Sequence, residues 1–232
     1  MIQFKNVSFS YEPETPILKN ISFTLNSNEI VGIVGESGSG KSTISSLMLN
    51  MSAPDSGTIE RHASKILPIF QHAYNCFNPK KTIRASLKEA LKYYAQRASD
   101  FDSSVLPLMQ DMDLSEALLD QYPDQLSGGQ LQRFNTLRSL MLTPEVLVCD
   151  EITSNLDVVA ETKLIEILQT YYKKHDMSMI MISHDIAVLN RFVQRLIVVQ
   201  NGRIVDNFPI HELFDDTRHD YTKSLIAMYD EA

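Results

Sequence analysis

The sequence has few cysteines and no long apolar run, and both shortages narrow the protein classes that fit it. Its 232 residues include two cysteines, Cys76 and Cys149, which are too few for a disulfide framework or a cysteine-rich metal site. No stretch approaches the roughly 18 consecutive apolar residues of a transmembrane helix, and no basic start followed by an apolar segment marks a signal peptide. We therefore expect an intracellular protein that acts at a membrane only through a partner.

Basic residues are also in the minority. Lys and Arg together number 21 against 29 Asp and Glu, which gives a net charge of −8 at neutral pH. A general nucleic-acid binder needs a positive surface to contact phosphates, so we expect no nucleic-acid partner. Because 44% of the residues are hydrophobic, the chain can bury a sizeable core, and we predict a single domain over residues 1–232.

Strand-like segments occur at both ends of the chain. Residues 1–34 are rich in β-type patterns, and short apolar runs return at 146–149 and 179–182. Helix-like segments separate these runs, and strands that alternate with helices imply a largely parallel sheet covered on both faces. Asn201-Gly202, between two further apolar runs, predicts a tight hairpin near the C-terminus.

The middle of the chain has a different pattern. Leu87, Leu91 and Tyr94 recur at a spacing that suits one face of an amphipathic helix. Few β-branched runs occur in the surrounding sequence. We therefore predict a helical subdomain over about residues 72–126.

The strongest local motif is a glycine-rich loop that follows an apolar strand and precedes a helix. It matches G-x-x-x-x-G-K-[ST] and reads Gly35-Glu36-Ser37-Gly38-Ser39-Gly40-Lys41-Ser42-Thr43. Glycines let successive backbone N–H groups turn toward a phosphate, and the helix N-terminus adds partial positive charge. Lys41 would reach the β- and γ-phosphates, and the Ser42 hydroxyl would bind Mg²⁺. These residues predict a nucleotide site.

Two further motifs carry polar groups to the starts of helices or the ends of strands. Leu126-Ser127-Gly128-Gly129-Gln130 begins a helix, where Ser127 could cap it while amides face an anion, although an ordinary helix start fits equally well. Asp150 and Glu151 end an apolar strand, which suits Asp150 to hold Mg²⁺ and Glu151 to polarise a water for attack. His184 ends the next apolar strand.

With these motifs together, the sequence resembles the ATP-binding subunits of ABC transporters over essentially its whole length. The resemblance assigns residues 35–43 to Walker A, Leu126 to Gln130 to the family signature, and Asp150 and Glu151 to Walker B. It also makes Gln71 the Q-loop residue, a contact to nucleotide and metal, and His184 a catalytic residue. The remaining assignments are Tyr11 against adenine and Ser154-Asn155-Leu156-Asp157 as the D-loop.

What this resemblance implies is an α/β P-loop NTPase of ABC type. Its mostly parallel core sheet would be joined by an N-terminal antiparallel β subdomain and the helical subdomain. The expected cofactors are ATP and Mg²⁺, and ATP would be hydrolysed between two cassettes in a head-to-tail dimer. The second cassette would be a similar chain or a second copy. Two membrane permeases and an extracytoplasmic solute-binding protein would complete an importer, with this chain peripheral on the cytoplasmic face.

Weaker features concern the branch and the cargo. The segment 71–82, Tyr122 to Gln125 and the tail 219–225 look like those of oligopeptide, dipeptide and nickel importers. The sequence stops at Ala232 without the extension of many peptide-importer subunits, so it resembles the nickel branch better. A peptide importer remains an alternative. A DNA-repair or translation ABC ATPase is another, although those have long coiled coils between the motifs or two nucleotide domains in one chain.

Overall fold

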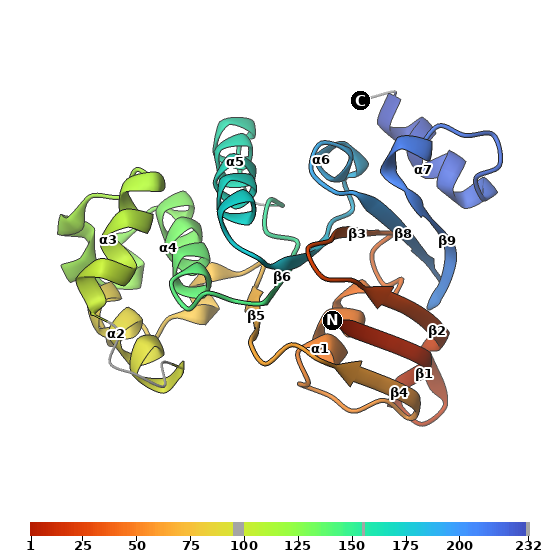
Figure 1. The fold of residues 1–232 in the computed structure, drawn as a ribbon, viewed down its shortest axis with the longest axis horizontal. Coiled ribbons are helices and arrows are strands. Elements are labelled where there is room, and N and C mark those ends of the chain that lie inside the picture. Colours follow the sequence, from red (N-terminus) through yellow and green to blue (C-terminus); the bar gives the residue numbers. More distant parts are fainter. Residues whose placement is uncertain (95–99, 155, 231–232) are drawn as a thin grey trace. The chain divides into compact units, whose positions relative to one another are not determined.

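The computed structural model describes the chain in three stretches, residues 1–94, 100–154 and 156–230. Its contacts group into two compact units (Figure 1). The first consists of residues 1–68, 145–151 and 176–232, and the second of residues 69–144 and 152–175. The expected helical segment, 72–126, lies wholly in the second unit, which reaches further along the chain. In the described stretches, no helix combines the length and the apolar character needed to cross a bilayer.

The first unit contains a three-stranded antiparallel sheet near the N-terminus. β1 (Ile2–Glu12) lies between β2 (Thr15–Leu25) and β4 (Ser56–Arg61) and is antiparallel to both. Alternate side chains of these strands face the core, where the rings of Phe4 and Phe23 stack with centroids 4.6 Å apart. The antiparallel β region expected at the N-terminus is therefore confirmed.

A six-stranded sheet holds the core of the first unit. In spatial order its strands are β5 (Ile66–Ile69), β6 (Val146–Asp150), β7 (Ser178–Ile182), β3 (Ile30–Val34), β8 (Arg195–Gln200) and β9 (Arg203–Pro209). β6, β7, β3 and β8 run parallel, which confirms the mostly parallel sheet, and β9 pairs antiparallel with β8. The hairpin between them turns at Asn201 and Gly202, whose φ angles of 49° and 76° suit a type I′ turn.

The parallel strands bring their carboxyl ends to one edge of this sheet. β3 lies between β7 and β8, and β6 lies next to β7. In open α/β sheets, ligands bind at this edge, where a strand order reverses. The glycine loop after β3, the acidic pair at the end of β6 and His184 after β7 therefore belong to one edge.

Helices of the first unit include one that the sequence did not predict. α1 (Lys41–Met48) follows the glycine loop as expected, and α6 (Ile186–Asn190) and the one-turn η4 (Ile210–Glu212) are short. α7 (Asp220–Asp230) covers the tail that the sequence indicated only as a mark of the importer branch. The tail is thus a folded part of this unit.

The second unit is helical among its described residues. Its elements are η1 (Ala73–Cys76), α2 (Ile83–Tyr94), α3 (Phe101–Asp111), η2 (Glu116–Asp120), η3 (Pro123–Gln125), α4 (Gly128–Leu140) and α5 (Val158–Lys174). Leu87 and Leu91 of α2 are buried as predicted. Tyr94 is 47% exposed, so its prediction as part of the apolar face was wrong; Ile83 fills the first position of that face instead.

Neither of the two cysteines forms a disulfide. Both are free thiols: Cys149 is fully buried in β6, and Cys76 is half-buried at the end of η1. Burial raises the pKa of both thiols, since the interior disfavours the charged thiolate. This agrees with the expectation that neither belongs to a disulfide framework.

Candidate nucleotide site

The glycine loop between β3 and α1 takes a shape that depends on small residues. Gly38 and Gly40 have φ angles of 81° and 108°, values that side chains rarely allow. At Gly35 the limit is space, because a Cβ there would lie 2.2 Å from the backbone oxygen of Val199. Within the loop, the Ser39 N–H donates to the Glu36 carbonyl at 3.2 Å, and the Gly202 N–H donates to the Ser39 carbonyl at 3.1 Å. These two backbone hydrogen bonds hold the loop in its curved shape.

Gly35→Ala should consequently destabilise the fold more than the same change at Gly38. The new methyl group at Gly35 must displace the β8 backbone, which costs about 2–3 kcal/mol in the free energy of unfolding. At Gly38 no atom lies within 4 Å of the added Cβ, so only the left-handed φ is penalised, by about 1 kcal/mol. Urea unfolding of the two variants measures the difference. Equal losses of stability would contradict the close approach at Gly35.

Lys41, the first residue of α1, points its amine back at the loop. The Nζ atom donates to the Gly35 carbonyl at 2.7 Å and to the Glu36 carbonyl at 2.8 Å, and the residue is only 5% exposed. Burial lowers the pKa of Lys41, whereas the carboxylates of Glu151 and Asp150 raise it. The loop carbonyls thus hold a buried amine at the N-terminus of a helix, where anions bind.

Ser42 and Asp150 supply the oxygen atoms of this site. The Ser42 Oγ donates to Asp150 Oδ1 at 3.4 Å, which brings the first turn of α1 to the end of β6. Burial raises the pKa of Asp150, and the Glu151 carboxylate raises it further, while hydrogen bonds from Ser42 and Ser45 lower it. Hydroxyl and carboxylate oxygens are the ligands that Mg²⁺ prefers, so these two residues fit that ion.

The loop also contains a buried hydroxyl without a partner. Ser39 is 5% exposed, and its Oγ makes no hydrogen bond to any residue that the structure describes. A buried polar atom of this kind costs free energy unless something pairs with it. A phosphate oxygen is a chemically suitable partner at this position.

Glu151 and His184 lie next to each other beyond the two strand ends. Glu151 has a left-handed φ of 48°, and its N–H donates to the Ile182 carbonyl of β7 at 3.0 Å. Its Oε1 is 3.9 Å from His184 Nδ1, a distance at which a protonated imidazole would form an ion pair. The carboxylate is 23% exposed and the imidazole 62% exposed, so both can meet solvent water.

Tyr11 completes the expected set in the first unit. It is 64% exposed, its ring packs edge-on against Phe9 with centroids 4.9 Å apart, and its hydroxyl is 3.4 Å from Thr43 Oγ1. An exposed ring fixed beside the end of the glycine loop suits stacking on a planar base. The structure thus brings Tyr11, residues 35–43, Asp150, Glu151 and His184 to one region.

The remaining predicted residues belong to the second unit. Gln71 Nε2 donates to Ser154 Oγ at 3.1 Å, which joins the expected Q-loop to the expected D-loop. Asp157 accepts from the Ala160 N–H at 2.9 Å and caps α5. Asn155, also in that segment, lies outside the described residues.

The Ser-Gly-Gly-Gln segment forms the start of α4. Ser127 Oγ accepts from the Gln130 N–H at 3.2 Å, and Gln130 Oε1 accepts from the Ser127 N–H at 3.0 Å, which makes a reciprocal capping box. No atom lies within 4 Å of a Cβ built on Gly128 or Gly129, so the space above both glycines is open. This helix start is therefore ordered and accessible to a ligand.

Sequence reasoning missed one residue that contacts the glycine loop. The Tyr221 hydroxyl of α7 accepts a hydrogen bond from the Glu36 N–H at 2.9 Å. The two residues are 185 positions apart, and the sequence indicated Tyr221 only within the tail motif. No local pattern links them.

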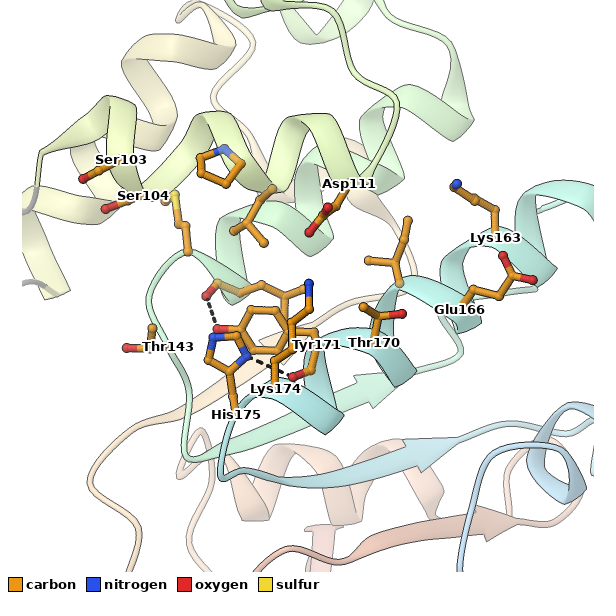
Figure 2. Close-up of a pocket in the computed structure, with 15 residues that line it drawn as sticks. Ser103, Ser104, Asp111, Thr143, Lys163, Glu166, Thr170, Tyr171, Lys174 and His175 are labelled. Atoms are coloured by element: carbon orange, nitrogen blue, oxygen red, sulfur yellow. Dashed lines mark hydrogen bonds between the residues drawn. The ribbon is translucent and has the colours of Figure 1, made fainter.

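A cavity of about 560 Å³ lies elsewhere, within the second unit. It is lined by α3, the end of α4 and α5, and Asp111, Lys163 and Glu166 lie along it (Figure 2). Tyr171 spans its floor, where its hydroxyl donates to the Leu140 carbonyl at 2.8 Å. None of the predicted nucleotide residues lines it, so it is separate from the site at the glycine loop.

Comparisons with known proteins identify the family to which these motifs and this fold belong. The family model described as ABC transporter matches residues 18–154. The chain is 47% identical over 231 residues to the nickel import system ATP-binding protein NikE of Staphylococcus aureus strain MSSA476, covering 99% of each chain.

Two solved structures are also similar. The dimeric structure of MJ0796, a bacterial ABC transporter cassette, is 27% identical with a TM-score of 0.82, over 90% of this chain and 99% of that one. The same cassette in a post-hydrolysis dimer bound to ADP and Pi is 25% identical, with a TM-score of 0.81 and the same coverage. The expected P-loop fold of ABC type is therefore confirmed.

Proposed function

We propose that this chain drives the import of nickel or a nickel chelate. It belongs to the ABC transporter family and is one of its ATP-hydrolysing subunits. The observation that supports nickel as the cargo is the 47% identity to a nickel import system ATP-binding protein over 99% of both chains. The relative and this chain match from end to end, which supports the same role in the same kind of complex. We further propose that the two units work as one ATP-binding domain.

Each residue of the nucleotide site has a proposed role. Lys41 binds the β- and γ-phosphates, and residues 35–43 enclose them with backbone N–H groups. Ser42, Asp150 and Gln71 are the residues that would hold Mg²⁺, which when bound would supply positive charge against the phosphates. Glu151 takes a proton from the attacking water, and His184, 3.9 Å away, orients the reacting groups.

A second cassette completes the site in this proposal. The start of α4, at Ser127, would face the glycine loop of the partner, since the space above Gly128 and Gly129 is open. Val158 and Val159, which follow Asp157, are 76% and 80% exposed beside an apolar cavity of about 780 Å³. Exposed apolar side chains of this kind mark an interface. The partner is a similar chain or a second copy, and Tyr11 stacks on the adenine of the enclosed ATP.

The permeases have a proposed docking place on the second unit. A cavity of about 480 Å³ is lined there by Gln71, Tyr74, Pro123 and Leu126, among others. Tyr74 is 49% exposed, so an apolar helix from a permease could cover it. In this proposal the chain lies on the cytoplasmic face of the membrane, and a solute-binding protein on the other side supplies the cargo.

Nickel uptake by the native host tests the cargo. Cells whose chromosomal copy carries Glu151→Gln should take up radioactive nickel, supplied at nanomolar concentration, at least about 10-fold more slowly than wild-type cells, because the proton acceptor for hydrolysis is lost. Cells with Glu166→Gln, the same change on the exposed surface of α5, should behave as the wild type.

The same two strains should be given a labelled oligopeptide. Loss of peptide uptake with normal nickel uptake would assign the chain to the peptide branch. If the second cassette is a different chain, the strain also carries the same change at the equivalent glutamate of that chain. Normal uptake of both cargoes in that strain would overturn an import role for this chain.

A further inference from the structure

The peptide between Gly35 and Glu36 is held from both sides. Its carbonyl, that of Gly35, accepts from Lys41 Nζ at 2.7 Å, and its N–H, that of Glu36, donates to the Tyr221 hydroxyl at 2.9 Å. A trans peptide is planar and points its C=O and N–H in opposite directions. Tyr221, the peptide and Lys41 therefore form one hydrogen-bonded line, in which each bond polarises the next in the same sense.

Glycine makes this peptide dependent on its hydrogen bonds. Gly35 has no side chain to pack, and a Cβ is excluded there by the Val199 carbonyl. Glycine has the largest backbone freedom of any residue, so packing does little to fix the plane of the following peptide. The hydrogen bond that the Glu36 N–H donates to the Tyr221 hydroxyl supplies that constraint.

We propose that Tyr221 is a positioning residue for nucleotide binding, which holds the Gly35–Glu36 peptide so that its carbonyl seats the Lys41 amine at the phosphate site. This makes the C-terminal helix α7 a part of the nucleotide site, although it contains no phosphate-binding motif. The inference rests on the proposed role of Lys41 in binding the β- and γ-phosphates.

Tyr221 is itself held in place by the start of α7. Asp206 of β9 accepts from the His219 N–H at 2.9 Å and from the Thr222 hydroxyl at 3.0 Å, both at Oδ2. The Arg218 guanidinium lies 3.5 Å from Oδ1 of the same carboxylate, and Thr222 is fully buried. The helix that carries Tyr221 is thus anchored to the sheet on both sides of that residue.

The environment of Tyr221 keeps its hydroxyl in the state that the contact needs. The residue is 9% exposed, and burial raises the pKa of its phenol, so the hydroxyl stays neutral at physiological pH. A neutral phenol accepts from a backbone N–H while keeping its own proton. Phenylalanine would fill the same space without the acceptor.

Tyr221→Phe should therefore weaken nucleotide binding and leave the chemical step nearly intact. An ordinary intramolecular hydrogen bond changes an equilibrium constant by a factor of about 2 to 12, so we expect the Kd for ATP to rise about 3- to 10-fold. The kcat at saturating ATP should stay within about 2-fold, because Glu151 and Asp150 are unchanged. A purely structural role would instead lower the unfolding temperature and kcat, with the Kd unaltered.

The experiment compares four full-length proteins: the wild type, Tyr221→Phe, Lys41→Ala and Tyr93→Phe. Tyr93 is 81% exposed on α2, so its variant controls for loss of a hydroxyl elsewhere. Calorimetry gives the Kd for ATP, and the ATPase rate of the assembled complex gives kcat. A Kd for Tyr221→Phe within 2-fold of the wild type would overturn the positioning role of Tyr221 and leave the proposed role of Lys41 standing. If Lys41→Ala also bound ATP as the wild type does, the proposed role of Lys41 would fail first.

A second variant guards against loss of folding in Tyr221→Phe. Thr222→Val keeps the shape of the buried residue but removes its bond to Asp206, and it should raise the Kd in the same direction by a smaller factor. If Thr222 acts through Tyr221, the double variant should bind ATP as weakly as Tyr221→Phe and no more weakly. Additive effects in the double variant would show that α7 does not act through this hydroxyl.

Discussion

Replacing Glu151 with glutamine is expected to lower ATP turnover by about 10²- to 10⁴-fold, the usual effect of losing a general base. Glutamine is nearly isosteric with glutamate and keeps the backbone N–H that donates to the Ile182 carbonyl. It cannot accept the proton of the attacking water at neutral pH, and it removes the negative charge beside His184. The loss should therefore fall on the chemical step.

Binding should survive this substitution. Lys41, Ser42 and Asp150 are unchanged, so ATP and Mg²⁺ should still bind. Because ATP would close the cassette dimer and hydrolysis would reopen it, the variant should accumulate as a closed dimer. Light scattering in the presence of ATP measures the dimer fraction, alongside the ATPase rate.

The experiment needs a control variant, and it needs a matching change in the second cassette. Glu166→Gln, on the exposed face of α5, should hydrolyse ATP at the wild-type rate. If the second cassette is a different chain, its equivalent glutamate must be changed as well, since one intact site could mask the loss. Near-normal hydrolysis in the doubly changed complex would show that another group is the base, and lost ATP binding would show that Glu151 is structural.

Lys41→Ala is expected to weaken ATP binding by about 100-fold and to bring hydrolysis to background. Hydrogen bonds to charged groups contribute about 1.5–3 kcal/mol each, and the amine would make such bonds to the phosphates. In the structure, the amine is held by the carbonyls of Gly35 and Glu36, so it already lies beside the loop that encloses the phosphates. Alanine leaves both carbonyls without this donor.

The matched control for Lys41 is another lysine in a helix. Lys92 of α2 is exposed, and Lys92→Ala should leave the Kd for ATP within about 2-fold of the wild type. Thermal unfolding of both variants checks that each is folded. A folded Lys41→Ala protein with normal ATP affinity would remove the glycine loop from the nucleotide site.

Much of the site in the first unit follows from local patterns in the sequence. The glycine loop, the acidic pair at Asp150 and Glu151, and His184 each follow an apolar strand, and parallel strands bring such ends to one edge. Each motif directly follows its apolar strand in the sequence, so the local pattern is enough to predict where its residues lie. The capping role of Ser127 was predicted in the same way and is confirmed by its capping box.

Other features depend on contacts between distant segments, which no local pattern contains. The bond from Glu36 to Tyr221 joins residues 185 positions apart. Tyr94 suited the apolar face of α2 by spacing, but its exposure depends on where that face ends in the packed unit. The tail around Tyr221 was interpreted only as a feature of the importer branch. Its helix is anchored by hydrogen bonds to Asp206, a residue of another segment, and the tail sequence alone does not show these bonds.

The complete burial of Cys149 has a practical consequence for spectroscopy. A maleimide reacts with an accessible thiolate, and Cys149 is buried in β6 with its pKa raised by that burial, so it does not compete for such a reagent in the folded protein. Cys76 is half-buried, so it would be replaced by serine before a fluorophore or spin label is attached to one introduced cysteine. Met228, 68% exposed on α7, is a suitable position, and a label there would report whether the C-terminal helix moves when ATP binds.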